Sequence, residues 1–148
     1  MKNIKGSGDS GFTLIELLVV IVILGLLASI VGPKILNRAD DAKFTKAISD
    51  IQGLSTALSM YKLDNGIYPD TEQGLQALIE SPASGTLPKK WRKGGYLQIR
   101  KIQKDPWNND YVYICPGAHG DFDISAYGGD GMAGGEDNNR DVNSWDTE

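Results

Sequence analysis

Residues 12–32 read FTLIELLVVIVILGLLASIVG, and this stretch decides how the rest of the chain must be organised. Its 21 residues carry a single charge, Glu16. A helix of that length reaches about 30 Å, the thickness of the hydrocarbon core of a bilayer. A helix that is apolar on every face needs a membrane or a large protein around it, and a chain of 148 residues is too small to enclose one. The stretch therefore predicts a membrane-inserted helix.

The residues before this stretch argue against a secretory signal peptide that is removed with its apolar core. Such a signal has a basic start, an apolar run of about 7–15 residues, and small residues behind that run at the cleavage site. Here the start, MKNIKGSGDSG, is polar and only weakly basic, and its small residues precede the apolar run. Because this order is reversed, the apolar segment is expected to remain in the mature protein.

Composition and motif content limit the function classes. A net charge of −4 and a pI of about 5.0 do not call for a nucleic-acid partner. A single cysteine, Cys115, excludes an internal disulfide. The sequence holds no zinc-ligand spacing, phosphate loop or G-x-S-x-G motif, so we expect a protein that is not an enzyme. An enzymatic alternative would depend on Cys115 and the only histidine, His119, acting as a nucleophile and its base.

A second helical pattern follows the apolar stretch. Apolar residues recur there at spacings of three or four, with charged residues between them: Phe44, Ile48, Ile51, Leu54, Leu58 and Tyr61. This spacing is typical of an amphipathic helix that packs on one side. The two patterns predict one long helix from about residue 13 to 63, which ends at the turn signal Asp64-Asn65-Gly66.

The remainder of the chain predicts a small antiparallel sheet. A short helix is expected from Asp70 or Thr71, as its cap, to Glu80. Three segments then alternate or are rich in β-branched and aromatic residues, namely 96–102, 111–115 and 121–127. A sheet of three short strands must pack on something, and the amphipathic half of the long helix is available. The expected fold class is therefore α+β.

The residues at the start of the apolar stretch resemble a known processing motif. Gly11-Phe12-Thr13-Leu14-Ile15-Glu16, followed by the apolar run, resembles the leader motif of type IV pilins and pseudopilins. The resemblance implies that a prepilin peptidase cuts after Gly11 and that Phe12 becomes N-methylphenylalanine. It also implies three regions: a leader at 1–11, a transmembrane and assembly helix at 12–34, and a periplasmic domain at 35–148. The protein would then be a single-pass protein of a bacterial inner membrane.

Glu16 is the exceptional residue of the apolar segment. A carboxylate in hydrocarbon costs several kcal/mol unless it is paired. It follows Phe12 by one helical turn and shares its face. The resemblance implies that Glu16 meets the positive terminal amine of a neighbouring subunit and so sets subunit register during assembly. An acid that is merely tolerated at the membrane edge remains the alternative.

Further motifs narrow the resemblance to the major pseudopilins of type II secretion systems, the general secretion pathway protein G family. These motifs are Asn65-Gly66-Ile67-Tyr68-Pro69, Gln73-Gly74-Leu75, Lys104-Asp105-Pro106-Trp107, Ala126-Tyr127-Gly128-Gly129-Asp130-Gly131, Gly134-Gly135 and Asn143-Ser144-Trp145. The resemblance implies a type IV pilin-like fold whose subunits form a helical homopolymer, the periplasmic pseudopilus. That filament would drive the export of folded proteins across the outer membrane, together with minor pseudopilins and an inner-membrane assembly platform.

A type IV pilin or competence pilin, which serves adhesion, motility or DNA uptake, is the alternative. The leader motif is shared by all pilin-like proteins and does not separate the two. Pilins of that kind usually close their C-terminal region with a pair of cysteines, whereas this chain has Cys115 alone. The cysteine count therefore favours the pseudopilin.

An acidic, glycine-rich loop occupies residues 121–141. It carries six carboxylates, opposed by one arginine: Asp121, Asp123, Asp130, Glu136, Asp137 and Asp141. Clustered carboxylates repel one another unless a cation gathers them, and Ca²⁺ accepts six to eight oxygen ligands in flexible geometry. The spacing is not that of an EF-hand, because Val142 stands where that motif needs glycine. By composition alone, a solvated flexible loop and a calcium site are equally favoured.

The resemblance favours calcium, because pseudopilins of this family bind it in this loop. Carried over by position, it implies Asp130 and Asp137 as carboxylate ligands and Asn138 as a neighbouring side-chain ligand. The carbonyl oxygens of Tyr127 and Met132 complete the expected set.

Overall fold

The computed structural model describes residues 12–146, except for the side chains of residues 31–37. The predicted leader, with Gly11 as its last residue, lies outside the described residues. The chain divides into two compact units, Met1–Ala39 and Asp40–Glu148, and each is described by itself.

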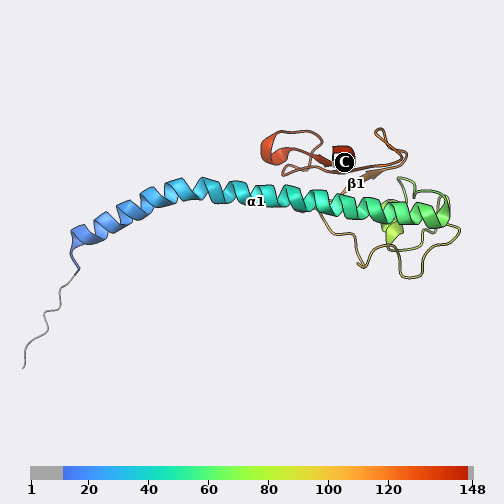
Figure 1. The fold of residues 1–148 in the computed structure, drawn as a ribbon, viewed down its shortest axis with the longest axis horizontal. Coiled ribbons are helices and arrows are strands. Elements are labelled where there is room, and N and C mark those ends of the chain that lie inside the picture. The colour runs from blue at the N-terminus through green and yellow to red at the C-terminus, as the bar shows by residue number, and fades with distance from the viewer. Residues whose placement is uncertain (1–11, 147–148) are drawn as a thin grey trace, which may run out of the picture. The chain divides into compact units, whose positions relative to one another are not determined.

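A single helix, α1, runs from Leu14 to Asn65 over 52 residues and confirms the predicted long helix (Figure 1). Thr13 and Glu16 form a capping box at its start. The backbone N–H of Thr13 donates to Glu16 Oε2 at 2.8 Å, and the N–H of Glu16 donates to Thr13 Oγ1 at 3.3 Å. At its end, Gly66 takes a φ of 78° and its N–H donates to the Lys62 carbonyl, which is a glycine C-terminal cap.

In the first unit, the large apolar side chains of α1 are exposed on every face. They extend from Leu14, which is 88% exposed, to Ile30, and Phe12 just before the helix is exposed as well. Within the described part of the chain, no helix is both long enough and apolar enough to cross a membrane.

In the second unit, one face of α1 forms the core. Ile51, Leu58 and Tyr61 are fully buried there, with Phe44 and Leu54 beside them. The other side of the core comes from the one-turn 3₁₀ helix η1 (Leu75–Leu78) and from the sheet. The amphipathic pattern of the sequence therefore marks the packed face correctly except at Ile48, which is 37% exposed.

The sheet has three antiparallel strands in the order β1-β2-β3, along α1 (Figure 1). They are β1 (Val112–Ile114), β2 (Asp123–Ala126) and β3 (Val142–Asn143). Tyr113 lies opposite Ile124, and Ala126 lies opposite Val142. The α+β fold and the strands predicted at 111–115 and 121–127 are confirmed. The sequence did not indicate β3, because two residues carry no readable alternation.

The strand predicted at 96–102 is wrong, because this segment is a loop of bends. Tyr96 explains the loop: its N–H donates to the Leu78 carbonyl at 2.7 Å, and its hydroxyl accepts from the buried amide of Asn65 at 2.9 Å. Leu97 and Ile102 still pack against the core. Apolar residues at Leu97, Ile99 and Ile102, with polar residues between them, gave this segment the sequence pattern of a strand.

The helix predicted from 70 to 80 is much shorter than expected. Asp70 does begin the turn, since its Oδ1 accepts the Gln73 N–H at 2.8 Å. Gly74 then takes φ 59° and ψ −167°, which is far from helical, and only the single turn η1 follows.

Replacing Leu58 by Ala should cost about 2–5 kcal/mol in the free energy of unfolding, because its side chain is 0% exposed and leaves a cavity. Leu63→Ala, on the same helix but 84% exposed, is the matched control and should change stability by less than about 0.5 kcal/mol. Denaturant unfolding of the two variants measures the difference. Equal losses would show that this face of α1 is not the core.

Candidate functional site

The part of the acidic loop that follows β2 has two halves, residues 127–132 and 136–141, which lie directly against each other. The N–H of Gly129 donates to the Asn138 carbonyl at 3.1 Å. A Cβ placed on Gly128 or on Gly135 would stand 2.5 Å from the Asn139 carbonyl oxygen, and Gly135 has a φ of 108°. Side chains are therefore excluded at both positions, and glycine lets the two halves close. This closure brings the segments of Asp130 and Asp137 together.

The predicted ligands are distributed over both halves. In the first, the Tyr127 carbonyl accepts from Gly131 N–H at 3.0 Å, and Asp130 Oδ1 accepts from Met132 N–H at 3.1 Å. In the second, Asp137 is exposed and has a φ of 53°, which an aspartate tolerates better than most residues. Asn138 donates its side-chain amide to Asp40 Oδ2 of α1 at 2.8 Å.

Asp141 is a residue of this loop that sequence reasoning did not select as a ligand. Its Oδ2 accepts the Gly134 N–H at 2.8 Å. Its Oδ1 is buried and has no hydrogen-bond partner. A buried carboxylate oxygen is costly unless a donor or a cation meets it. The sequence signal was weak, since Asp141 was one of six acids in the loop.

The donor set of the loop suits calcium better than a transition metal. Among the described residues, no three His, Cys, Asp or Glu side chains come together as a metal cluster. The predicted set contains two carboxylates, one side-chain amide and two backbone carbonyls, and Ca²⁺ uses ligands of these kinds. The unpartnered Asp141 oxygen belongs to the same loop. The kinds of donor in the predicted set therefore suit calcium, and the ligand assignment stays a prediction.

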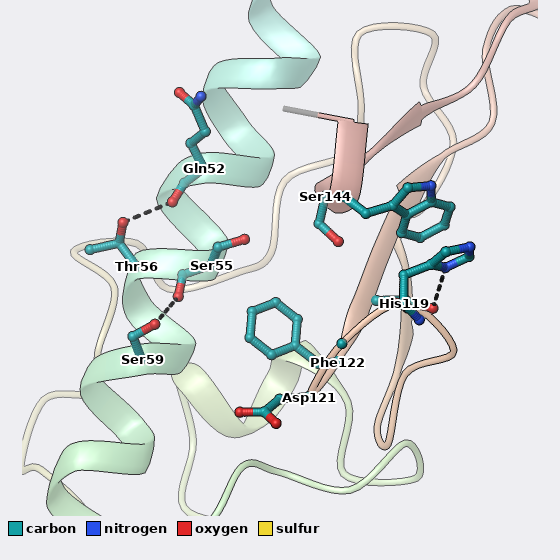
Figure 2. A pocket seen from close by; sticks show the side chains of 11 residues that line it. Gln52, Ser55, Thr56, Ser59, His119, Asp121, Phe122 and Ser144 are labelled. Atoms are coloured by element: carbon teal, nitrogen blue, oxygen red, sulfur yellow. Dashed lines mark hydrogen bonds and ion pairs between the residues drawn. The ribbon is translucent and has the colours of Figure 1, made fainter. Parts of the chain in front are cut away.

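A polar groove of about 590 Å³ lies elsewhere on the second unit, between α1 and the turn that precedes β2 (Figure 2). Hydroxyl groups line its α1 side, and two of them donate along the helix: Thr56 to the Gln52 carbonyl and Ser59 to the Ser55 carbonyl. The opposite side carries His119 and Trp145, whose rings stack with centroids 3.7 Å apart.

His119 and Cys115, the pair that an enzymatic alternative would use, contact different groups. His119 Nδ1 lies 3.1 Å from Asp123 Oδ2. Cys115 Sγ lies 3.5 Å from the Asp121 carbonyl, and the Cys115 backbone N–H donates to Thr71. These contacts hold the turn between Cys115 and His119. The histidine ring is oriented by Asp123 and by the Trp145 ring.

Asp123 has an altered pKa. Its side chain is 8% exposed, and this burial opposes ionisation. Hydrogen bonds from the Ala118 N–H at 2.8 Å, the His119 ring and the His119 N–H outweigh the burial and hold the pKa of Asp123 below its ordinary value. The ionised carboxylate therefore stabilises the folded turn.

At the N-terminal end, the structure describes Phe12 and Glu16 but not Gly11. The Glu16 carboxylate accepts both from the Thr13 N–H and from the Thr13 hydroxyl, each at 2.8 Å. Within one chain, Thr13 is thus the partner of this carboxylate. The predicted contact with a neighbouring subunit is not tested by the structure of one chain.

Two protein families match the chain, and together they cover almost all of it. Residues 34–145 match the family described as type II secretion system (T2SS), protein G. Residues 6–32 match the prokaryotic N-terminal methylation motif.

Individual relatives agree with these matches. The chain is 52% identical over 138 residues to the type II secretion system core protein G of Pseudomonas aeruginosa, covering 93% of this chain and 96% of that protein. It is 48% identical over 137 residues to the protein of the same name from Vibrio cholerae, covering 93% and 92%. The fold resembles the crystal structure of the major pseudopilin from the type 2 secretion system of enterohaemorrhagic Escherichia coli. That match has a TM-score of 0.65 at 40% identity and covers 75% of this chain and 93% of that chain.

Replacing Asp123 by Asn should lower stability at pH 7 by about 1–3 kcal/mol, because three hydrogen bonds lose their charged acceptor. The folded pKa lies below the unfolded value of about 3.9, so the contribution is complete above that value and is lost as the pH falls through the folded pKa. The difference between variant and wild type should therefore shrink below about pH 4.

Denaturant unfolding between pH 7 and pH 3 measures this difference. Asp110→Asn is the control, because the Asp110 side chain is 86% exposed and its ion pair with Lys104 lies on the surface. A constant difference over the whole pH range would contradict the role given to the ionised Asp123.

Proposed function

The chain belongs to the type II secretion system protein G family, and from that membership we propose that it polymerises into the periplasmic pseudopilus. It is a major pseudopilin, and the type IV or competence pilin alternative is not favoured. The observation that carries the proposal is the continuity of the two family matches, since the methylation motif over 6–32 leads directly into the protein G region over 34–145. The filament drives the export of folded proteins across the outer membrane.

The exposed apolar half of α1 supports a role in storage and assembly. Each Å² of apolar surface removed from water contributes about 25 cal/mol, so side chains such as Leu14, Ile21 and Ile30 favour a covered state. Before assembly, residues 12–34 span the inner membrane. In the filament, the same residues pack against neighbouring helices. Gly25 has open space around it, where another helix can approach closely.

Maturation prepares the N-terminal end for assembly. A prepilin peptidase removes residues 1–11 by cutting after Gly11, and the new amine of Phe12 is methylated. Residues 35–148 then lie in the periplasm. Minor pseudopilins and an inner-membrane assembly platform are the expected partners. The net charge of −4 supports a function without nucleic acid.

The contacts of His119 and Cys115, the two residues that an enzyme of this sequence would need, agree with a structural role without catalysis. His119 is held by Asp123 and by the Trp145 ring, and Cys115 is held by Asp121 and Thr71. The energy for filament growth must come from another protein. This chain supplies the surfaces through which the subunits pack against one another.

Glu16 sets the register between subunits. In hydrocarbon its carboxylate needs a partner, and Thr13 supplies two hydrogen bonds within one chain. The positive terminal amine of Phe12 in a neighbouring subunit is a stronger partner, because both groups are charged. That amine exists only after the cut at Gly11, so maturation and assembly are linked.

The acidic loop holds a calcium ion through Asp130, Asp137, Asn138 and the carbonyls of Tyr127 and Met132. The fit of this donor set and the unpartnered Asp141 oxygen support the proposal. Bound there, calcium offsets the repulsion among the carboxylates and favours the closed loop. The closed loop in turn holds β3 beside β2, because β3 begins one residue after Asp141.

Replacing Glu16 by Val should abolish most filaments, because the terminal amine of the next subunit loses its charged partner. Thr13→Val is the control. It removes the hydroxyl that Glu16 uses within one chain and leaves the carboxylate, so filaments should remain. Electron microscopy of overexpressed protein scores the filaments. Normal filaments from the Glu16 variant would refute the register role.

Calcium should raise the melting temperature of the mature chain in detergent relative to chelator. At a free calcium concentration of about 100 Kd, the expected gain is about 2.7 kcal/mol. Asp137→Ala should lose most of this gain. Glu136→Ala, which removes a neighbouring exposed carboxylate outside the predicted set, should keep it. Identical melting temperatures of the wild type in calcium and in chelator would disprove the calcium site.

A further inference from the structure

We propose that Asp40 of α1 is a positioning residue for the calcium site, because it holds the side-chain amide of Asn138 in the orientation that leaves its oxygen for the cation. The inference rests on the calcium site proposed above and adds a residue from outside the loop. It also gives the loop a specific connection to the helix.

The hydrogen bond between the two residues fixes the orientation of the amide. Asn138 Nδ2 donates to Asp40 Oδ2 at 2.8 Å, although the residues are 98 positions apart in the sequence. An ionised carboxylate only accepts hydrogen bonds, and an amide side chain donates only through its nitrogen. The nitrogen must therefore face Asp40. Asn138 Oδ1 is then the side-chain atom that remains for a hard cation, which binds oxygen.

Asp40 uses its two carboxylate oxygens separately. Oδ2 accepts from Asn138, whereas Oδ1 lies 3.8 Å from Lys43 Nζ on the next turn of the helix. The Asp40 side chain is 22% exposed, whereas Asn138 is exposed, so the accepting end of this hydrogen bond is the more buried one. The lysine thus contacts the oxygen that Asn138 does not use.

A second contact holds the same part of the loop on the same face of α1. The guanidinium carbon of Arg140 lies 4.1 Å from the centroid of the Phe44 ring. Phe44 follows Asp40 by four residues, so the two share one face of the helix. Asn138 and Arg140 flank Asn139, whose carbonyl packs against Gly128 and Gly135. The tightest part of the loop is thus attached to α1 at two points.

This attachment couples the cation to the first turn of α1 in the second unit, which begins at Asp40. Coupling between two sites is reciprocal. If the Asp40 contact favours calcium binding, then calcium binding must strengthen the Asp40 contact by the same factor. Occupancy of the loop thereby stabilises its attachment to α1 at Asp40.

The test is calcium titration of the mature chain in detergent by calorimetry. Asp40→Ala should weaken calcium binding about ten-fold or more, the usual effect of losing a group that orients a metal ligand. Asp40→Asn keeps an accepting oxygen and should stay within about three-fold of the wild type. Asp41→Ala removes the same charge one residue away, on an exposed side chain, and should bind as the wild type does.

Asp40→Glu separates positioning from charge. It keeps the charge and moves the carboxylate by one methylene, so calcium binding should weaken several-fold even though the variant is as acidic as the wild type. A simple charge effect predicts the reverse order, with Asp40→Glu normal and Asp40→Asn weak. That order would overturn the proposal. Melting temperatures in chelator show which variants are folded, and the Glu and Asn variants decide the outcome if Asp40→Ala does not fold.

A double-mutant cycle with Asn138→Ala completes the test. In that background, Asp40→Ala should have no further effect on the calcium Kd, because there is no amide left to orient. Additive effects would overturn the proposal. If the wild type binds no calcium, the calcium site itself fails. If the wild type binds calcium and both Asp40→Ala and Asp40→Glu bind it equally well, only the role of Asp40 fails.

Discussion

The packing of one face of α1 over the small sheet is the interaction on which the rest of the second unit depends. The sheet has three strands, and β3 has two residues, so it could not hold together alone in water. Ile51, Leu58 and Tyr61 give it a fully buried surface to rest on. The irregular segments between η1 and β1 follow the same surface, and the buried Asn65 fastens them through Tyr96 and Lys90.

The acidic loop closes the end of the sheet without a covalent bond. Cys115 is the only cysteine of the chain, so glycine packing and hydrogen bonds must hold the loop. Asp141 fixes Gly134 within the loop, whereas Asn138 and Arg140 fix it to α1. An acidic loop held in this way accumulates negative charge, which a cation would offset. The same geometry therefore supports both the closed shape and the proposed calcium site.

Prediction from the sequence succeeded for elements with a long regular pattern. It failed for segments whose conformation is set by contacts with other parts of the fold. The helix was expected over 13–63 and runs over Leu14–Asn65, because caps and periodicity are local signals. The segment 96–102 was expected as a strand. It is a loop, in which the Tyr96 N–H donates to the Leu78 carbonyl and the Tyr96 hydroxyl accepts from the Asn65 amide. Gly74 shortened the helix expected from 70 to 80, because its backbone conformation is not helical.

The sequence by itself determined the family, the apolar segment 12–32, the N-terminal methylation motif over residues 6–32 and the acidic loop. Each of these features can be recognised from consecutive residues or from a regular spacing of residues. Only the tertiary structure decided that Asp40 holds Asn138, that Asp141 leaves one oxygen unpartnered, and that His119 stacks on Trp145. These contacts join residues brought together by chain folding, or depend on which atoms burial leaves without a partner. Local periodicity in the sequence encodes neither these contacts nor the unpartnered atoms, because both depend on how α1 and the sheet pack.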